Sequence, residues 1–140
     1  MKKKILLISL FFSLTSLSSA VFSTPSPPGA AVYIISPAHG EIVSNPVTVK
    51  FGLSGMGVAP AGVNKINTGH HHLLIDLENL PTSKRAIPKN ANHRHFGGGQ
   101  TEITFDLAPG IHTLQLLLGD MAHIPHQPAI VSEKITITVK

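Results

Sequence analysis

The sequence predicts an all-β protein, an immunoglobulin-like antiparallel β-sandwich without a disulfide. Short runs of alternating apolar and polar residues recur between turns, and no segment of the mature chain has the 3.6-residue apolar period of an amphipathic helix. The 140 residues include 12 Gly and 11 Pro but no Cys. Short strands separated by turns are typical of a sandwich. Cys and Trp are both absent, so the core cannot contain the disulfide and packed tryptophan of antibody domains. "Immunoglobulin-like" therefore describes the architecture only.

The first 20 residues predict a secretory signal peptide. Met1–Lys4 is basic, residues 5–17 are mostly apolar, and Ser18-Ser19-Ala20 supplies small residues for cleavage. The apolar run is shorter than the about 20 residues that span a bilayer, and no Cys follows it to carry a lipid. We therefore expect a periplasmic or secreted protein without stable membrane insertion. Residues 21–31 are expected to form a flexible lead-in, and residues 32–140 a single His-rich β-sandwich domain.

Without the signal peptide the chain carries almost no net charge. The full sequence has 11 Lys and Arg against 7 Asp and Glu, and removal of Lys2, Lys3 and Lys4 leaves 8 against 7. The only dense basic spot is Lys84-Arg85, so we expect no nucleic acid partner, which would require a basic face or stripe. Nine His and no Cys leave imidazole as the main ligand type for a borderline metal ion.

The strands follow from alternation and from the turn residues between them. Val47–Leu53 shows the clearest alternation of a half-buried strand. The Gly-rich loop of residues 55–68 matches neither a dinucleotide fingerprint nor a nucleophile elbow. The expected strands, in order, are Val32–Ser36, Val47–Leu53, Gly69–Leu77, Thr101–Leu107, Ile111–Leu118 and Ile130–Val139.

The central segment is Gly69–Leu77, GHHHLLIDL, a buried strand that begins with three imidazoles. Successive side chains of a strand point to opposite faces. His71 shares the more apolar face and is expected on the core side. His70 and His72 then project together from the other face, at a spacing that a strand can present to one metal ion.

Two polar loops carry further histidines. The first, residues 78–92, is long for a small domain, and such loops are more often functional than mere connectors. It leads to His93, His95 and three consecutive glycines, but no Gly-Lys-Ser/Thr follows, so a phosphate-binding loop is not supported. The second loop, residues 119–128, holds His123, His126 and Asp120.

These groups together predict a site for zinc or copper. Loops and strand ends gather at the poles of a sandwich, so histidines that are distant in sequence can meet. Zinc takes about three or four protein ligands at about 2.0–2.1 Å, and nitrogen-rich sites also suit copper. Asp120 or Asp76 can supply an oxygen or orient an imidazole. The candidate ligands are His70, His72, His95, His123, His126 and Asp120.

Two alternatives stand beside a metal site. Histidines are common at turns and strand ends, where they hydrogen bond to the backbone, and we expect a structural role for His39, His71 and His112. The cluster can also be a pH-responsive polar group without metal, because crowded imidazoles protonate reluctantly and repel one another once charged.

Four motifs resemble the signature of a bacterial family of exported proteins described only as a domain of unknown function. They are GHHHLLIDL, HRHFGGGQTE, PGIHTLQLLLGD and HIPHQP, and the similarity covers Ile66 to Val139. The resemblance implies a small β-sandwich but no activity. Gln127 departs from the family, in which an acidic residue is usual, so no carboxylate ligand is available there. The family pattern includes His70, His71, His72, His95, His112, His123 and His126.

Three hypotheses on function follow. The first is an exported module that binds zinc or copper for buffering, transport or sensing. The second is a non-enzymatic domain that binds an envelope protein through a pH-responsive histidine cluster. The third is a metal-dependent hydrolase with Glu102 or Asp120 as the base. No HExxH motif and no Ser-His-Asp order supports catalysis, so we assign no catalytic residues.

Overall fold

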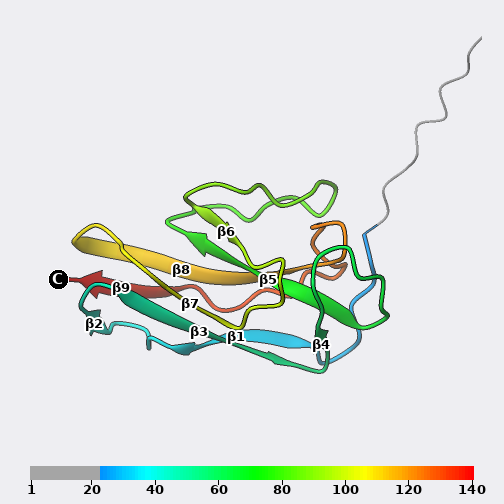
Figure 1. The fold of residues 1–140 in the computed structure, drawn as a ribbon, viewed down its shortest axis with the longest axis horizontal. Coiled ribbons are helices and arrows are strands. Elements are labelled where there is room, and N and C mark those ends of the chain that lie inside the picture. Colours follow the sequence, from blue (N-terminus) through cyan, green and yellow to red (C-terminus); the bar gives the residue numbers. More distant parts are fainter. Residues whose placement is uncertain (1–22) are drawn as a thin grey trace, which may run out of the picture.

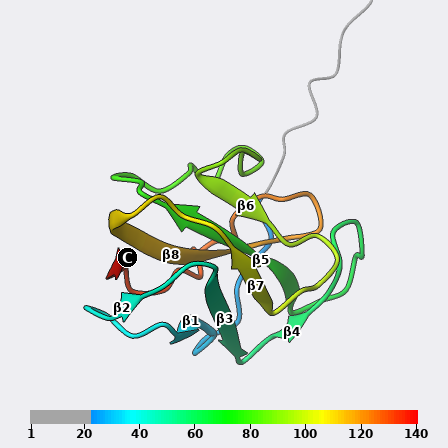
Figure 2. The same cartoon turned by 60° about the vertical axis from the view of Figure 1, so that its left-hand side comes forward.

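The structure, a computed structural model, describes residues 23–140. The predicted signal peptide lies outside the described residues. Residues 23–140 form nine strands and no helix, arranged in two sheets that pack face to face (Figures 1 and 2), which confirms the predicted all-β sandwich. No helix that could cross a membrane occurs in this part of the chain. The strands are β1 (Ala31–Ser36), β2 (Ile42–Val43), β3 (Val47–Ser54), β4 (Gly57–Val58), β5 (Thr68–Ile75), β6 (His93–His95), β7 (Glu102–Phe105), β8 (Gly110–Gly119) and β9 (Ile135–Val139).

One sheet is small and the other large. The small sheet has the order β1-β3-β7, and the large sheet has the order β2-β9-β8-β5-β4, with β6 also paired to β5. The long strands pair antiparallel, as predicted. The two-residue strands β2 and β4 pair in parallel with β9 and β5.

Alternation along β3 fixes its two faces. Val47, Val49 and Phe51 are buried, while Thr48 and Lys50 are exposed. This pattern is the half-buried strand that the sequence predicts, and it directs one side of the small sheet into the core.

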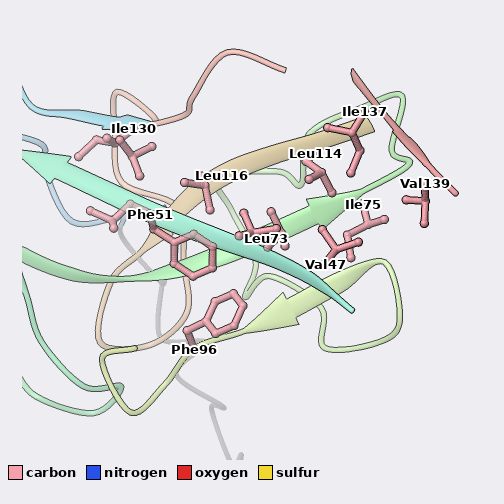
Figure 3. Close-up of a cluster of buried hydrophobic side chains, with 13 residues drawn as sticks. Val47, Phe51, Leu73, Ile75, Phe96, Leu114, Leu116, Ile130, Ile137 and Val139 are labelled. Carbon is pink, nitrogen blue, oxygen red and sulfur yellow. The ribbon is translucent and has the colours of Figure 1, made fainter. Parts of the chain in front are cut away.

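The main core fills the space between the sheets (Figure 3). Phe51 of the small sheet packs against Phe96, which follows β6, with ring centroids 4.8 Å apart. Leu73 on β5 and Leu116 on β8 are fully buried in the same cluster. The inner faces of both sheets are therefore apolar, as the alternation predicts.

The sequence did not predict β2, β4 or β6. Strands of two or three residues are too short to show a period, so only their tertiary pairing identifies them. The expected last strand also differs, because the continuous ladder begins at Ile135 rather than Ile130. Before it, Ser132 exchanges hydrogen bonds with the backbone of Leu116, and Val131 forms an isolated bridge to Leu117.

The outer face of the large sheet is covered by loops. The segment between β5 and β6 lies over this face on the side away from β1 and β3, and the segment after β8 lies beside it (Figures 1 and 2). Ile87 of the first segment packs on Leu74 and Leu117 in a second, smaller cluster. This cover buries polar side chains that would otherwise face solvent, and it creates the candidate site.

Candidate metal centre

The three consecutive histidines of β5 are all fully buried, His71 on one face of the sheet and His70 and His72 on the other. His71 points into the core, where its ring centroid lies 5.2 Å from that of Phe51. The rings of His70 and His72 lie together, with centroids 4.8 Å apart, among histidines from outside β5. Strand parity thus separates the three imidazoles as predicted.

Two other parts of the chain bring further imidazoles to His70 and His72. Strand β6 pairs with β5 so that His95 stands opposite His72, and the segment after β8 brings His123. The ring of His95 stacks on that of His123 with centroids 4.6 Å apart. The six centroid distances among these four rings, which we call the histidine cluster, are between 4.6 and 6.2 Å.

The nitrogen atoms of the cluster approach the geometry of a metal site. Nε2 of His70 and Nε2 of His72 lie 3.0 Å apart. Two nitrogens bound to one tetrahedral zinc at about 2.0–2.1 Å lie roughly 3.3 Å apart. One nitrogen each from His70, His72 and His95 lie within 4.8 Å of one another. A small inward movement of His95, which is half-buried on the short strand β6, would bring three ligands to one ion.

Two glycines make room for these rings. A Cβ on Gly119 would lie 2.8 Å from Nε2 of His72, and a Cβ on Gly97 would lie 2.3 Å from Cε1 of His95. Both distances are too short for a side chain at these positions. These glycines belong to the LLLGD and HFGGG motifs, in which the sequence showed only loop and turn glycines.

Several cluster nitrogens lack a hydrogen-bond partner. Within the described chain, Nδ1 of His70, Nδ1 of His72 and Nε2 of His95 are buried without one. A buried polar group without a partner costs about 1–3 kcal/mol, and folded proteins contain few of them. In His70 and His72 the unpaired nitrogen is Nδ1, whereas the two Nε2 atoms face one another.

The environment keeps the imidazoles of His70, His72 and His95 neutral, because it lowers the pKa of each. Burial, followed by the effect of the neighbouring His123 and His95, lowers the pKa of His70 to about 4, although Asp120 acts in the opposite direction. Burial, followed by the effect of His70, His95 and His123, lowers the pKa of His72 to about 2. Burial, His123 and Lys89 also lower the pKa of His95. Neutral imidazole is the form that binds a metal ion.

The segment that carries His123 is held by Asp120. Its carboxylate accepts hydrogen bonds from the backbone N–H groups of Ala122 and Ile124 at 2.9 and 3.0 Å, and from the hydroxyl of Thr24 at 2.7 Å. Burial raises the pKa of Asp120, but these hydrogen bonds and the nearby His126 outweigh that effect and lower it. Asp120 therefore anchors the loop that carries His123.

His123 itself has a strained backbone. Its φ is 68°, in the left-handed region that residues other than glycine seldom adopt. The carbonyl of His123 accepts a hydrogen bond from Ile87, and its N–H donates one to Asp120. Such strain persists where the surrounding structure enforces it, and it concentrates at functional sites.

His126 is buried but stands apart from the four stacked rings. Its Nδ1 lies 3.5 Å from the carbonyl oxygen of Leu118, and its Nε2 is buried without a partner. No ring contact joins it to the cluster among the described residues. Of the six predicted ligands, the structure therefore brings together His70, His72, His95 and His123.

Two histidines have the structural role that the sequence predicts. Nδ1 of His39 accepts a hydrogen bond from the backbone of Thr136 at 3.1 Å. The ring nitrogens of His112 contact Oδ2 of Asp76 at 2.7 Å and the carbonyl of Ala108 at 2.8 Å. Burial lowers the pKa of His112, but these contacts outweigh it and raise the pKa.

Comparison with known proteins identifies a family without a described activity. The sequence model of the family described as Domain of unknown function (DUF4399) matches residues 49–140. The chain belongs to this family, and the matched region contains the whole histidine cluster. No curated protein and no solved structure matches the chain.

Proposed function

We propose that this DUF4399 protein binds a divalent transition metal, zinc or copper, through His70, His72 and His95, with His123 as the fourth ligand. The observation that carries the proposal is the convergence of four imidazoles from three separate parts of the chain. Nε2 of His70 and Nε2 of His72 lie 3.0 Å apart, and a nitrogen of His95 lies within 4.8 Å of both residues' ligand atoms, an arrangement that one shared metal ion would explain. An all-nitrogen ligand set is suited to zinc and to Cu(II).

The protein's role would be to hold the metal rather than to use it in catalysis. The two β5 histidines are fully buried, which favours storage, transport or sensing over open-site chemistry. Asp120 is occupied by three hydrogen bonds, and Glu102 lies on β7 opposite Lys50 in the other sheet. Neither carboxylate is placed to act as the base of a hydrolase. With the signal peptide that the sequence predicts, this function would operate in the periplasm or outside the cell.

A pH-responsive cluster for binding an envelope protein is less well supported. A switch between neutral and mildly acidic pH requires imidazoles that titrate in that range. The pKa values of His70 and His72, about 4 and about 2, lie below it.

The direct test is metal titration of the mature chain without an affinity tag. Zinc and Cu(II) are added separately, and the bound metal is measured by elemental analysis and the melting temperature by calorimetry. At a free metal concentration of 100 times Kd, binding stabilises the folded state by about 2.7 kcal/mol, which raises the melting temperature by several degrees. A protein that takes up neither metal at micromolar concentration, and whose melting temperature does not change, would rule out the proposal.

Matched variants locate the site. The double variant His72→Ala, His95→Ala should lose stoichiometric metal. The double variant His39→Ala, His112→Ala removes the same number of imidazoles outside the cluster and should keep it. His123→Gly suits the positive φ of this position and should weaken binding without unfolding the protein. Equal metal binding by all four proteins would contradict the assigned ligands.

A further inference from the structure

A pocket of about 410 Å³ lies beside the histidine cluster, at the edge of the sandwich where β6 meets β7. His95 of the cluster forms part of its wall. Lys89, His93 and Arg94 contribute further nitrogen groups, and Phe96 and Ile103 contribute apolar surface. The volume is within the range of small-molecule sites, which are about 300–1,000 Å³.

The pocket is lined by cations and no carboxylate. Lys89 and Arg94 both line it, and neither forms an ion pair with any residue between 23 and 140, where the one side-chain ion pair joins His112 and Asp76. Surface cations are ordinarily solvated, but two of them in one concave site without an acidic neighbour produce a local positive potential that attracts an anion.

Arg94 is held in position at this pocket. Its guanidinium lies over the ring of Phe105, with Cζ 5.3 Å from the ring centroid, a cation–π contact that restrains the side chain. Its Nε is buried and has no hydrogen-bond partner among the described residues. The two terminal nitrogens of the guanidinium form no hydrogen bond within residues 23–140, and together they are suited to bind a carboxylate through two hydrogen bonds.

The same positive character extends under the long loop between β5 and β6. A second pocket of about 320 Å³ shares His93 with the first and is lined by Arg85 and by apolar residues of the loop, again without a carboxylate. The Lys and Arg residues of this loop, which metal binding does not explain, are accounted for if the loop shapes a site for an anion.

We propose that the pocket formed by Lys89, His93 and Arg94 binds a small organic carboxylate next to the histidine cluster. The two cations would hold the carboxylate, and Phe96 and Ile103 would contact the carbon chain. This apolar wall favours an organic anion over inorganic phosphate. The site needs no metal ion, so it can exist whether or not the proposed metal function is correct.

The test is an NMR titration of the metal-free mature protein with succinate, inorganic phosphate and sodium chloride at matched ionic strength. Succinate should produce saturable shifts of the backbone amide signals of Lys89, Arg94 and His95, whereas chloride should not. The variant Lys89→Gln removes an exposed side chain and should weaken succinate binding by about tenfold, the usual effect of losing a charged hydrogen bond. Lys140→Gln removes the same charge at the far end of β9 and should leave the affinity unchanged.

The outcomes separate this proposal from the metal site. Arg94→Lys keeps the charge but not the planar donor pair, and it should bind succinate more weakly than the unmodified protein while remaining folded. Absence of saturable shifts, equal weakening by Lys89→Gln and Lys140→Gln, or binding of phosphate but not succinate would each overturn the carboxylate site. None of these results depends on whether zinc or copper binds, because all are obtained without metal.

Discussion

The histidine cluster and the contact between His112 and Asp76 are two histidine environments built on the same sheet. At His112 both ring nitrogens have partners, at 2.7 and 2.8 Å, and the pKa is raised. In the cluster the imidazoles mainly face one another, three ring nitrogens are buried without partners, and the pKa values of His70, His72 and His95 are lowered. Burial therefore does not by itself identify a ligand. What distinguishes the two environments is whether other groups of the protein form hydrogen bonds with the ring nitrogens.

His71 adds a third case. It is fully buried, neither of its ring nitrogens forms a hydrogen bond of normal geometry among the described residues, and burial outweighs a weak contact with the backbone of Gln100 to lower its pKa. However, it faces the core and Phe51 rather than other histidines. An isolated unpaired imidazole is a local cost to stability, whereas four converging imidazoles form a potential site. The following predictions test this difference, in order of decreasing effect.

The largest effect is expected for Gly119→Ala. The new Cβ would lie 2.8 Å from Nε2 of His72 and 3.4 Å from Ile87, so the ring must move away from the cluster. We expect a loss of about 3 kcal/mol or more in the free energy of unfolding, because the new Cβ overlaps a buried ring, and a weakening of metal binding by at least about tenfold. Chemical denaturation and metal titration measure the two effects.

Gly57→Ala is the matched control for this change. A Cβ at Gly57 would lie 3.5 Å from the side chain of Thr68, an ordinary contact. This variant should bind metal normally. If Gly119→Ala also binds normally, His72 is not a required ligand.

The second prediction concerns the stability of the metal-free protein at acidic pH. His70 and His72 have lowered pKa values in the folded state, about 4 and about 2, against about 6.5 in the unfolded chain. Their contribution to stability is complete above pH 6.5 and is lost progressively as the pH falls towards the folded values, because the unfolded state binds protons first. Between pH 7.5 and 5.5 the free energy of unfolding should fall by about 2–3 kcal/mol for the pair.

Denaturation curves at a series of pH values measure this fall. In His70→Gln, His72→Gln the slope between pH 7.5 and 5.5 should be clearly reduced, and the lowered pKa values of His71, His93 and His95 should preserve the remainder. His112 has the opposite sign, because its raised pKa gives stability below pH 6.5 that is lost as the pH rises through the folded value. If the stability of the metal-free protein is constant over this range, His70 and His72 are not buried in the uncharged form.

The third prediction is for His112→Gln. The variant loses the contact with Asp76, whose side chain is 40% exposed, so solvent screening limits the effect. We expect a loss of about 1 kcal/mol in the free energy of unfolding and no change in metal affinity. Weaker metal binding by this variant would show that the two histidine environments are coupled.

The smallest effect is expected for His71→Phe. The substitution keeps an aromatic ring against Phe51 and removes two buried nitrogens that have no partner. The free energy of unfolding should change by no more than about 1 kcal/mol, with stabilisation favoured, and metal binding should be retained. Loss of metal binding with an intact fold would show that His71 contributes to the metal site, as the histidines of the cluster are proposed to do.

The sequence by itself determined the fold class and the division of the histidines. Alternation along β3 and the turn residues between short strands were sufficient for the fold class, and the strand period of two residues decides which side chains of β5 share a face. The same parity separated His71 from His70 and His72 before any tertiary contact was known. The roles of His39 and His112 as backbone and loop partners also followed from their positions at turns and strand ends.

Only the tertiary structure decided which histidines meet. His95 reaches the cluster through β6, a three-residue strand with no readable period, and His123 reaches it through a loop with a positive φ that Asp120 anchors. The sequence placed Asp120 and His126 among the ligands on the same grounds as His123. Hydrogen bonds between residues far apart in the chain, such as that from Thr24 to Asp120, separate these roles, and no local pattern in the sequence encodes such contacts.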